Sequence, residues 1–266
     1  MDRGQYIEGK LSKLESRLNN SSQELIRALL LNFNPPTDDN GHLKFSLAYI
    51  ALFNRIWDRW VRGDRKTALD VVSSDLSDIH QSVLEYYSDE LDGDDIEVSP
   101  KVARIIDSLG FSSFAAGTFA GIILLAADVK NRIQQKIIYA MTSGQSFGYL
   151  GSIISEIPTE LSKYHKGYLF DLYSQVERIA AQTYAIDLNL THAVYAGDVI
   201  ETTREFCEDR VHKAFSLQEI QAWNDLDWRG KIPGVDVLVA LGGYNCRHYL
   251  NWISEGTYNQ IKEDND

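Results

Sequence analysis

Residues 191–198 read THAVYAGD, and the character of the sequence changes at this stretch. Val194 and Tyr195 favour β-structure, while Gly197 and Asp198 are typical of a turn, so the stretch predicts a strand followed by a turn. The sequence before it has the apolar spacing of helices, so we predict a domain boundary near residue 189. The three expected parts are a helical domain (1–189), a small α+β module (190–254) and a polar acidic tail (255–266).

The first part carries apolar residues at steps of three and four, the spacing of amphipathic helices. We expect helices over residues 6–31, 43–61, 67–87, 130–144 and 159–185. Consecutive prolines at Pro35 and Pro36 separate the first two of them, and a glycine-rich join (Gly144, Gly148 and Gly151) precedes the last. The predicted fold class is mainly α: a bundle of long helices followed by a small α+β module.

The segment Leu109–Ala127 contains no charged residue and is bounded by Asp107 and Asp128. Its length is close to the roughly 20 residues that cross a bilayer, and Gly117 and Gly121 have the spacing that lets membrane helices approach closely. Serine and threonine side chains dilute its hydrophobicity, however, and no basic or aromatic flank sets an orientation. We therefore expect a buried central helix, with a membrane span as the alternative.

The chain has 266 residues and a formal net charge of −12, with 44% hydrophobic and 24% charged residues. These values exclude a disordered tail, a collagen-like fibre and a polytopic membrane protein, and the acidic excess argues against a general binder of phosphate backbones. Two cysteines indicate a reducing compartment, and the polar start from Met1 to Lys10 indicates no signal peptide. The five carboxylates of Ser88–Asp95 lack the final Glu of a calcium loop, so we expect a solvated loop there.

Two capping signals predict short helices in the C-terminal module. Thr202 precedes Glu205 by three residues and should start a helix that carries Cys207, and Ser216 stands in the same relation to Glu219. The expected strands are residues 235–241 and 244–252, joined by a tight turn at Gly242 and Gly243.

The module also holds four side chains that could bind a metal: Cys207, His212, Cys246 and His248. Zinc accepts two cysteines and two histidines, but the spacing from Cys207 to His212 is wider than usual and that from Cys246 to His248 is tight. In a second interpretation the two cysteines are small buried residues that meet across the module, close enough to oxidise. A third casts Cys207 as a nucleophile with His248 and Asn245, although no nucleophile motif surrounds it. We predict no metal and no cofactor.

The aromatic content of the module is high for its size. Large side chains are needed to fill a small core, and Trp and Tyr also dominate the contacts of protein interfaces. The candidates for interaction are Trp223, Tyr244, Tyr249 and Trp252.

The order of motifs in residues 195–252 resembles the C-terminal domain of tailed-phage minor head proteins, the head morphogenesis or Mu F-like family. The family pattern is an aromatic-x-Gly start, a Thr-Arg-x-x-Cys helix, a Phe-x-x-x-Glu-Ile helix, a Trp-x-Gly loop and a closing Asn-Cys-Arg-His or Cys-Arg-Cys. The chain departs from it at His212, where the family has Gly, and it keeps one cysteine at each end where other members have two. The matching residues are Thr203, Arg204, Cys207, Phe215, Glu219, Trp228, Gly242, Gly243, Asn245, Cys246, Arg247 and His248.

The resemblance implies a structural component of the virion and not an enzyme. Family members associate with the portal and connector and act in head assembly, head–tail connection or DNA delivery. It therefore implies portal, connector or capsid proteins as partners in a symmetric assembly, with contact to packaged DNA compatible with the mixed charges of the module. Two alternatives stay open: a membrane-active ejection protein that uses Leu109–Ala127, and a zinc- or thiol-dependent enzyme.

Overall fold

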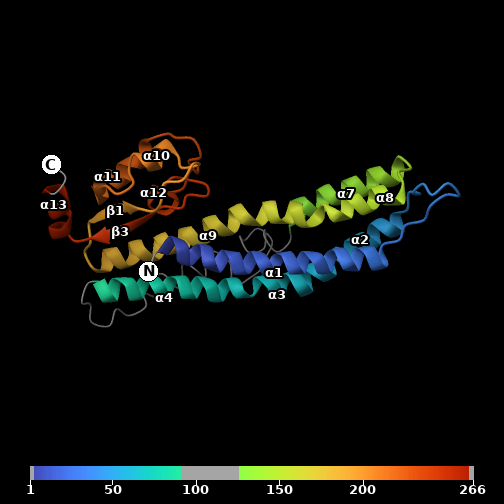
Figure 1. The fold of residues 1–266 in the computed structure, drawn as a ribbon, viewed down its shortest axis with the longest axis horizontal. Helices are drawn as coiled ribbons and strands as arrows, with labels where there is room; N and C mark the ends of the chain where they lie inside the picture. The colour runs from blue at the N-terminus through green and yellow to red at the C-terminus, as the bar shows by residue number, and fades with distance from the viewer. Residues whose placement is uncertain (1–2, 91–125, 264–266) are drawn as a thin grey trace. The chain divides into compact units, whose positions relative to one another are not determined.

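The computed structural model describes residues 3–90 and 126–263 (Figure 1). It is mainly helical with a small antiparallel sheet near the C-terminus, which confirms the predicted fold class. Residues 109–125 of the apolar segment and residues 91–95 of the acidic loop lie outside the described part of the chain. Within that part, no helix combines the length and the hydropathy needed to cross a membrane.

The long helices follow the predicted pattern closely. The expected breaks after the first helix and before residue 192 are both present, and the proline-containing stretch forms a loop. The helices before the sheet are α1 (Arg3–Asn32), α2 (Leu47–Trp60), α3 (Lys66–Leu69), α4 (Val71–Glu90), α7 (Ala127–Thr142), α8 (Phe147–Ser155) and α9 (Ile157–Asp187), with a π-helical turn η1 (Val61–Arg65) between α2 and α3.

Helix α8 replaces the predicted glycine-rich join. The side chain of Ser146 accepts a hydrogen bond from the backbone N–H of Tyr149 and so caps the helix at its start. Leu150, Ile153 and Ile154 then lie buried at helical spacing. This apolar face outweighs the modest helix penalty of the glycines, which is about 1 kcal/mol each.

The C-terminal module has a three-stranded sheet in the order β2-β1-β3, all antiparallel. Tyr195 on the central strand pairs with Leu250, and Ala193 lies between Phe215 and Trp252. Burial alternates along β1 and β3, so one face of the sheet enters the core. The elements are β1 (His192–Ala196), α10 (Glu205–Glu208), β2 (Ala214–Ser216), α11 (Leu217–Ala222), the 3-10 turn η2 (Trp223–Asp225), α12 (Val237–Ala240), β3 (Tyr249–Ile253) and α13 (Glu255–Glu263).

The region between residues 235 and 248 differs from the prediction. The expected strand at 235–241 is helix α12, because the Asp236 side chain accepts a hydrogen bond from the backbone N–H of Leu238 and caps a helical turn. The expected strand at 244–252 begins only at Tyr249. Leu241, Gly243 and Asn245 have positive φ angles, which an extended strand cannot contain.

The predicted polar tail also contains structure. Residues Glu255–Glu263 form helix α13, whose described side chains all remain at least partly exposed. The ring of Tyr258 stacks on His192 of β1 at a centroid distance of 4.1 Å. A short exposed helix therefore follows the last strand, and residues 264–266 lie outside the described part.

The described residues form two compact units. Unit 1 consists of residues 3–10, 74–90 and 169–263, and unit 2 consists of residues 11–73 and 126–168. The predicted boundary near residue 189 is therefore a change of secondary structure and not a division between compact units. The physical reason is that the buried face of the small sheet needs an apolar partner, which α4 and α9 supply.

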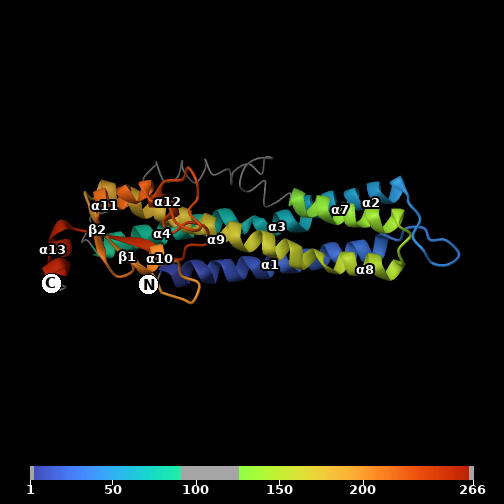
Figure 2. The same ribbon diagram turned by 90° about the horizontal axis from the view of Figure 1, so that it is seen from above.

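Unit 2 has an apolar core in which aromatic rings follow one another. Phe33, Phe53, Trp57 and Trp60 are fully or almost fully buried, with neighbouring ring centroids 5.3–6.2 Å apart. Trp60 also donates a hydrogen bond from Nε1 to the carbonyl oxygen of Ser21, at 2.7 Å. Helices α2, α7 and α8 gather at this core (Figure 2).

Unit 1 joins the module to the helices through a shared core. Val83 and Tyr87 of α4 and Tyr184 of α9 pack in one buried cluster with Tyr195 and Trp252 of the sheet. The start of α1 belongs to the same unit, and the buried guanidinium of Arg3 forms an ion pair with Glu177 at 2.6 Å. These contacts fix the sheet against the ends of three helices.

Candidate functional site

The most concentrated group of chemically reactive side chains in the described residues is buried in the C-terminal module. Helix α10 supplies Cys207, and the loop before β3 supplies Cys246 and His248. The two sulfur atoms and a ring nitrogen of His248 all lie within 4.8 Å of one another. All three residues are at most 4% exposed. We call these three residues the Cys-Cys-His cluster.

His212 is not part of this cluster. It is exposed at the turn after α10 and adopts a φ angle of 62°. The expectation that it could complete a Cys2His2 set is therefore wrong, because the turn directs position 212 to the surface. The expectation that the two cysteines meet across the module is confirmed, and both are free thiols.

Each sulfur of the cluster accepts a hydrogen bond. The hydroxyl of Tyr195 donates to Cys207 Sγ at 3.3 Å, and the backbone N–H of Gly242 donates to Cys246 Sγ at 3.3 Å. His248 Nδ1 lies 3.7 Å from Cys246 Sγ. The Tyr195 ring is fully buried against the imidazole, and desolvation raises the pKa of its hydroxyl. A neutral donor is thus held against the sulfur of Cys207.

The two thiols differ in acidity because they share a hydrogen bond. The bond that Cys207 donates to Cys246 lowers the pKa of Cys246 and raises that of Cys207. Burial adds to the increase at Cys207, while His248 and the positive charge of Arg178 add to the decrease at Cys246. Burial of Cys246 opposes the decrease in its pKa.

Gly242 is required at this point for reasons of space. A Cβ atom at residue 242 would overlap with Cys207 Sγ and would lie 3.0 Å from Cys246 Sγ. Gly243 has a φ angle of 93°, and a Cβ there would overlap with the carbonyl of Gly230. The glycine pair thus allows the backbone to pass directly beside the sulfurs.

Arg178 of α9 holds the loop that carries the cluster. Its guanidinium is buried and donates hydrogen bonds to the carbonyl oxygens of Cys246 and His248, at 2.6 and 2.8 Å. It also donates to the carbonyls of Val239 and Ala240, at 3.0 and 3.3 Å. A charged donor that satisfies several buried carbonyls is a strong structural contact. The sequence contained no signal for it, because its partners are backbone atoms far along the chain.

A second residue of α9 fixes the same loop from its other side. The carboxylate of Asp171 accepts a hydrogen bond from the backbone N–H of Asn245 at 2.5 Å. Burial raises the pKa of Asp171, whereas this hydrogen bond and the positive charge of Arg178 lower it. Asn245 itself has a φ angle of 55°, a conformation that asparagine tolerates better than most residues.

The remaining family-like residues surround the cluster. Arg204 donates a hydrogen bond to the carbonyl of Tyr244 at 2.6 Å, and Trp228 donates from Nε1 to the carbonyl of Gly242 at 3.1 Å. The Trp228 ring also stacks on Phe206 at a centroid distance of 3.9 Å. The loop after η2 and the turn before α10 therefore each donate a hydrogen bond to the segment Gly242–Tyr244.

The two capping predictions have different outcomes. Ser216 and Glu219 form the complete capping box of α11, as predicted. Thr202 and Glu205 do not form one: the N-cap residue of α10 is Arg204, whose side chain makes no capping hydrogen bond to any described residue. Thr203 instead accepts a hydrogen bond from the backbone N–H of Ile200 at 2.8 Å, which closes the preceding turn.

The aromatic interaction candidates are mostly buried. Trp223 and Trp252 are 6% and 4% exposed, so they fill the core and do not form a docking surface. Phe215 packs edge-on against Trp223 in the same core. Tyr244 is half exposed and Tyr249 is partly buried. The need to fill a small core explains the tryptophans.

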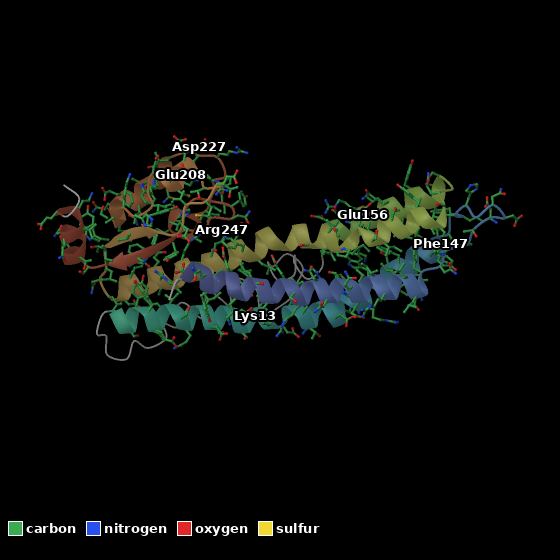
Figure 3. All side chains as sticks on the ribbon, in the orientation of Figure 1. Lys13, Phe147, Glu156, Glu208, Asp227 and Arg247 are labelled. Carbon is green, nitrogen blue, oxygen red and sulfur yellow. The ribbon has the colours of Figure 1, made fainter. Side chains whose placement is uncertain are left out.

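Arg247, labelled in Figure 3, is an exposed residue of the closing motif. Its half-exposed side chain forms an ion pair with Glu8 of α1 and lies over the ring of Phe170. It therefore links the module to the helical part of unit 1.

A small cavity of about 40 Å³ adjoins the cluster. It is lined by residues of the turn before α10 and of the loop that follows the glycine pair, including Arg204, Asn245 and His248. A space of this size holds a water molecule but not an organic substrate. The buried thiols thus suit packing or metal binding better than nucleophilic catalysis.

The chain matches no family model, no curated protein and no solved structure at a significant level. The resemblance to minor head proteins therefore depends on the ordered motifs themselves.

Proposed function

We propose that this chain is a minor head protein of a tailed bacteriophage, which acts at the portal, connector or capsid through protein–protein contacts. The observation that carries the proposal is the convergence of the family-like motifs. Three sequence segments that match in order, around Cys207, Trp228 and Gly242 to His248, pack against one another at a single buried centre. A shared packing centre is the kind of constraint that keeps such residues together in a structural domain.

The conformation of His212 gives independent support. The family pattern has Gly at this position, and the chain adopts a φ angle of 62° there, in the left-handed region that glycine favours. The turn after α10 therefore has the backbone conformation that glycine would favour at this position. The departure from the pattern is thus one of residue type and not of backbone shape.

The burial of the thiols favours a structural role over the enzyme alternative. A nucleophilic cysteine must reach its substrate, and both sulfurs here lie beneath Gly242, Tyr195 and Arg204. The motif residues therefore support the module and leave partner contacts to its surface. The membrane-active alternative depends on Leu109–Ala127, of which residues 109–125 lie outside the described part.

The test is the protein content of phage particles induced from the host that carries this gene. Particles would be purified by density gradient, washed in high salt and analysed by quantitative mass spectrometry. We expect the chain in full particles at a small fraction of the copy number of the major capsid protein. A matched strain with a stop codon at Lys13 gives the background level.

A structure-based variant makes the test specific. Arg247→Ala removes a surface charge of the closing motif, whereas Arg132→Ala removes one from α7 in unit 2. We expect Arg247→Ala to lower incorporation into particles more than Arg132→Ala. Absence of the wild-type chain from washed particles would refute the proposed function.

A further inference from the structure

We propose that the Cys-Cys-His cluster binds one zinc ion. The ligands are the sulfurs of Cys207 and Cys246 and a ring nitrogen of His248, and a water molecule in the adjoining cavity takes the fourth position. This inference is independent of the proposed role in the phage head, because it concerns only what holds the module together.

The distances between the donor atoms fit a tetrahedral ion. Zinc–sulfur bonds of about 2.3 Å and zinc–nitrogen bonds of about 2.0 Å place sulfur and nitrogen about 3.5 Å apart, and two sulfurs about 3.8 Å apart. Cys246 Sγ and His248 Nδ1 are 3.7 Å apart, and all three donor atoms lie within 4.8 Å of one another. Only small side-chain movements are needed to complete the coordination.

The hydrogen bonds around the cluster are those of an outer coordination shell. Both sulfurs accept a hydrogen bond, one from the Tyr195 hydroxyl and one from the Gly242 backbone. Zinc-bound cysteines are thiolates, and hydrogen bonds to sulfur stabilise that negative charge in a buried site. Two thiolates and one imidazole are also a donor set that suits zinc, since soft and borderline ligands select this ion over calcium or magnesium.

The state of His248 provides a second observation. The residue is 4% exposed, and among the described residues its Nε2 atom has no hydrogen-bond partner. Its Nδ1 atom has only the sulfur of Cys246 nearby. Buried polar atoms almost always have a partner, so an imidazole in this position calls for one that the protein does not supply. Zinc bound at Nδ1 would fix the proton on Nε2, and a water molecule in the adjoining cavity, which His248 lines, would accept a hydrogen bond from it.

The position of the cluster explains what the metal would do. It joins α10 to the loop that links α12 to β3, two segments that share no sheet pairing. A metal bound by both segments would cross-link them in addition to the apolar core that the module shares with α4 and α9. Zinc binding would release the remaining thiol protons to solvent and would hold α10 against the loop before β3.

The experiment measures metal in the full chain, produced in zinc-supplemented medium and purified under reducing conditions. Elemental analysis should find one zinc ion per chain in the wild type. Cys246→Ser and His248→Gln should each lower that content at least tenfold. His212→Gln is the matched control: it replaces an exposed histidine of the same module and should retain the wild-type content.

A second measurement remains valid where the variants fail to fold. The wild-type protein is stripped with a chelator and loaded with cobalt(II), which should give thiolate charge-transfer absorption and the intense visible bands of a tetrahedral ion. Zinc should then displace the cobalt, and the thermal unfolding temperature should be higher with zinc than with the chelator. Absence of both zinc and cobalt binding under reducing conditions would overturn the proposal. A Cys207–Cys246 disulfide in protein alkylated at the moment of cell lysis would overturn it equally.

Discussion

The two compact units of this chain are stabilised in different ways. Unit 2 is held by apolar side chains at helical spacing, with packed aromatic rings such as those of Phe53 and Trp57 at its centre. Unit 1 contains a module whose centre is polar: two thiols, an imidazole and a guanidinium bound to backbone carbonyls. An apolar core tolerates many changes of similar volume, whereas a centre of specific polar contacts does not. Single substitutions should therefore lower the free energy of unfolding more in the polar centre of unit 1 than in the apolar core of unit 2.

Gly242→Ala should have the largest effect. The added methyl group would overlap with Cys207 Sγ and would lie 3.0 Å from Cys246 Sγ, and a shift of the sulfurs away from it would disrupt the hydrogen bonds around the cluster. We expect the free energy of unfolding to fall by about 3 kcal/mol or more, as for overpacking of a rigid site. Urea unfolding followed by circular dichroism measures this change.

Gly151→Ala is the matched control in unit 2. Gly151 lies within α8, and a Cβ atom there meets no heavy atom within 4 Å. Alanine is a better helix former than glycine, so the same substitution should stabilise the protein by about 0.5–1 kcal/mol. If both changes had similar effects, the glycine turn would not be the constraint described for unit 1.

Arg178→Met should come second. It removes a buried charged donor and leaves four backbone carbonyls without it, so we expect the free energy of unfolding to fall by about 2–3 kcal/mol. Arg132→Met is the comparison in unit 2, where the exposed guanidinium forms an ion pair with Glu160. Exposed pairs contribute only about 0–1 kcal/mol, so this variant should be nearly neutral. Equal losses in urea unfolding would contradict the assignment of Arg178 as the anchor of the loop.

The helices of the chain differ in how well the sequence alone predicts them. The long helices were predictable because apolar periodicity is a local signal that extends over many residues, as in α1 and α9. Helix α8 is not predictable from its glycines, which indicate a break where Ser146 in fact caps a helix. The four residues of α12 are too few to show a helical period.

The candidate site was predictable only in part. The two cysteines and His248 were identified by residue type, but nothing in the spacing showed that His212 would turn outward. Arg178 and Asp171 were missed because they bind backbone groups of a loop more than 60 residues away, at 2.6 and 2.5 Å. Such contacts leave no pattern in a single sequence, since any residue type can supply a carbonyl or an N–H group.

A pH dependence should arise from unit 1. His80 of α4 is buried, and desolvation lowers its pKa from 6.5. Its Nε2 atom lies 2.6 Å from the hydroxyl of Tyr184, which can donate to the neutral ring. The folded state therefore binds this proton more weakly than the unfolded state. The contribution of neutral His80 to stability is complete above about pH 6.5 and is lost as the pH falls below it, by at most about 1.4 kcal/mol per pH unit.

The measurement is the urea midpoint at about pH 7.5 and about pH 5.5. His80→Gln keeps a polar group beside Tyr184 and should reduce the difference between the two midpoints. His42→Gln, at an exposed position of unit 2, should leave the difference as in the wild type. An unchanged difference in His80→Gln would show that another group causes the acid sensitivity.

His212→Gly should have the smallest effect, and it is expected to be favourable. A non-glycine residue in the left-handed region costs roughly 1 kcal/mol, and glycine removes that cost while it increases the conformational entropy of the unfolded chain. Because the His212 side chain is exposed and its backbone N–H donates to the carbonyl of Tyr195, the substitution removes no buried contact. The net gain should be a few tenths of a kcal/mol up to about 1 kcal/mol. His192→Gly, within strand β1, is the matched change at an extended residue and should destabilise the protein. A loss of stability in His212→Gly as large as that in His192→Gly would mean that the turn does not favour glycine, and the backbone argument for the family resemblance would fail with it.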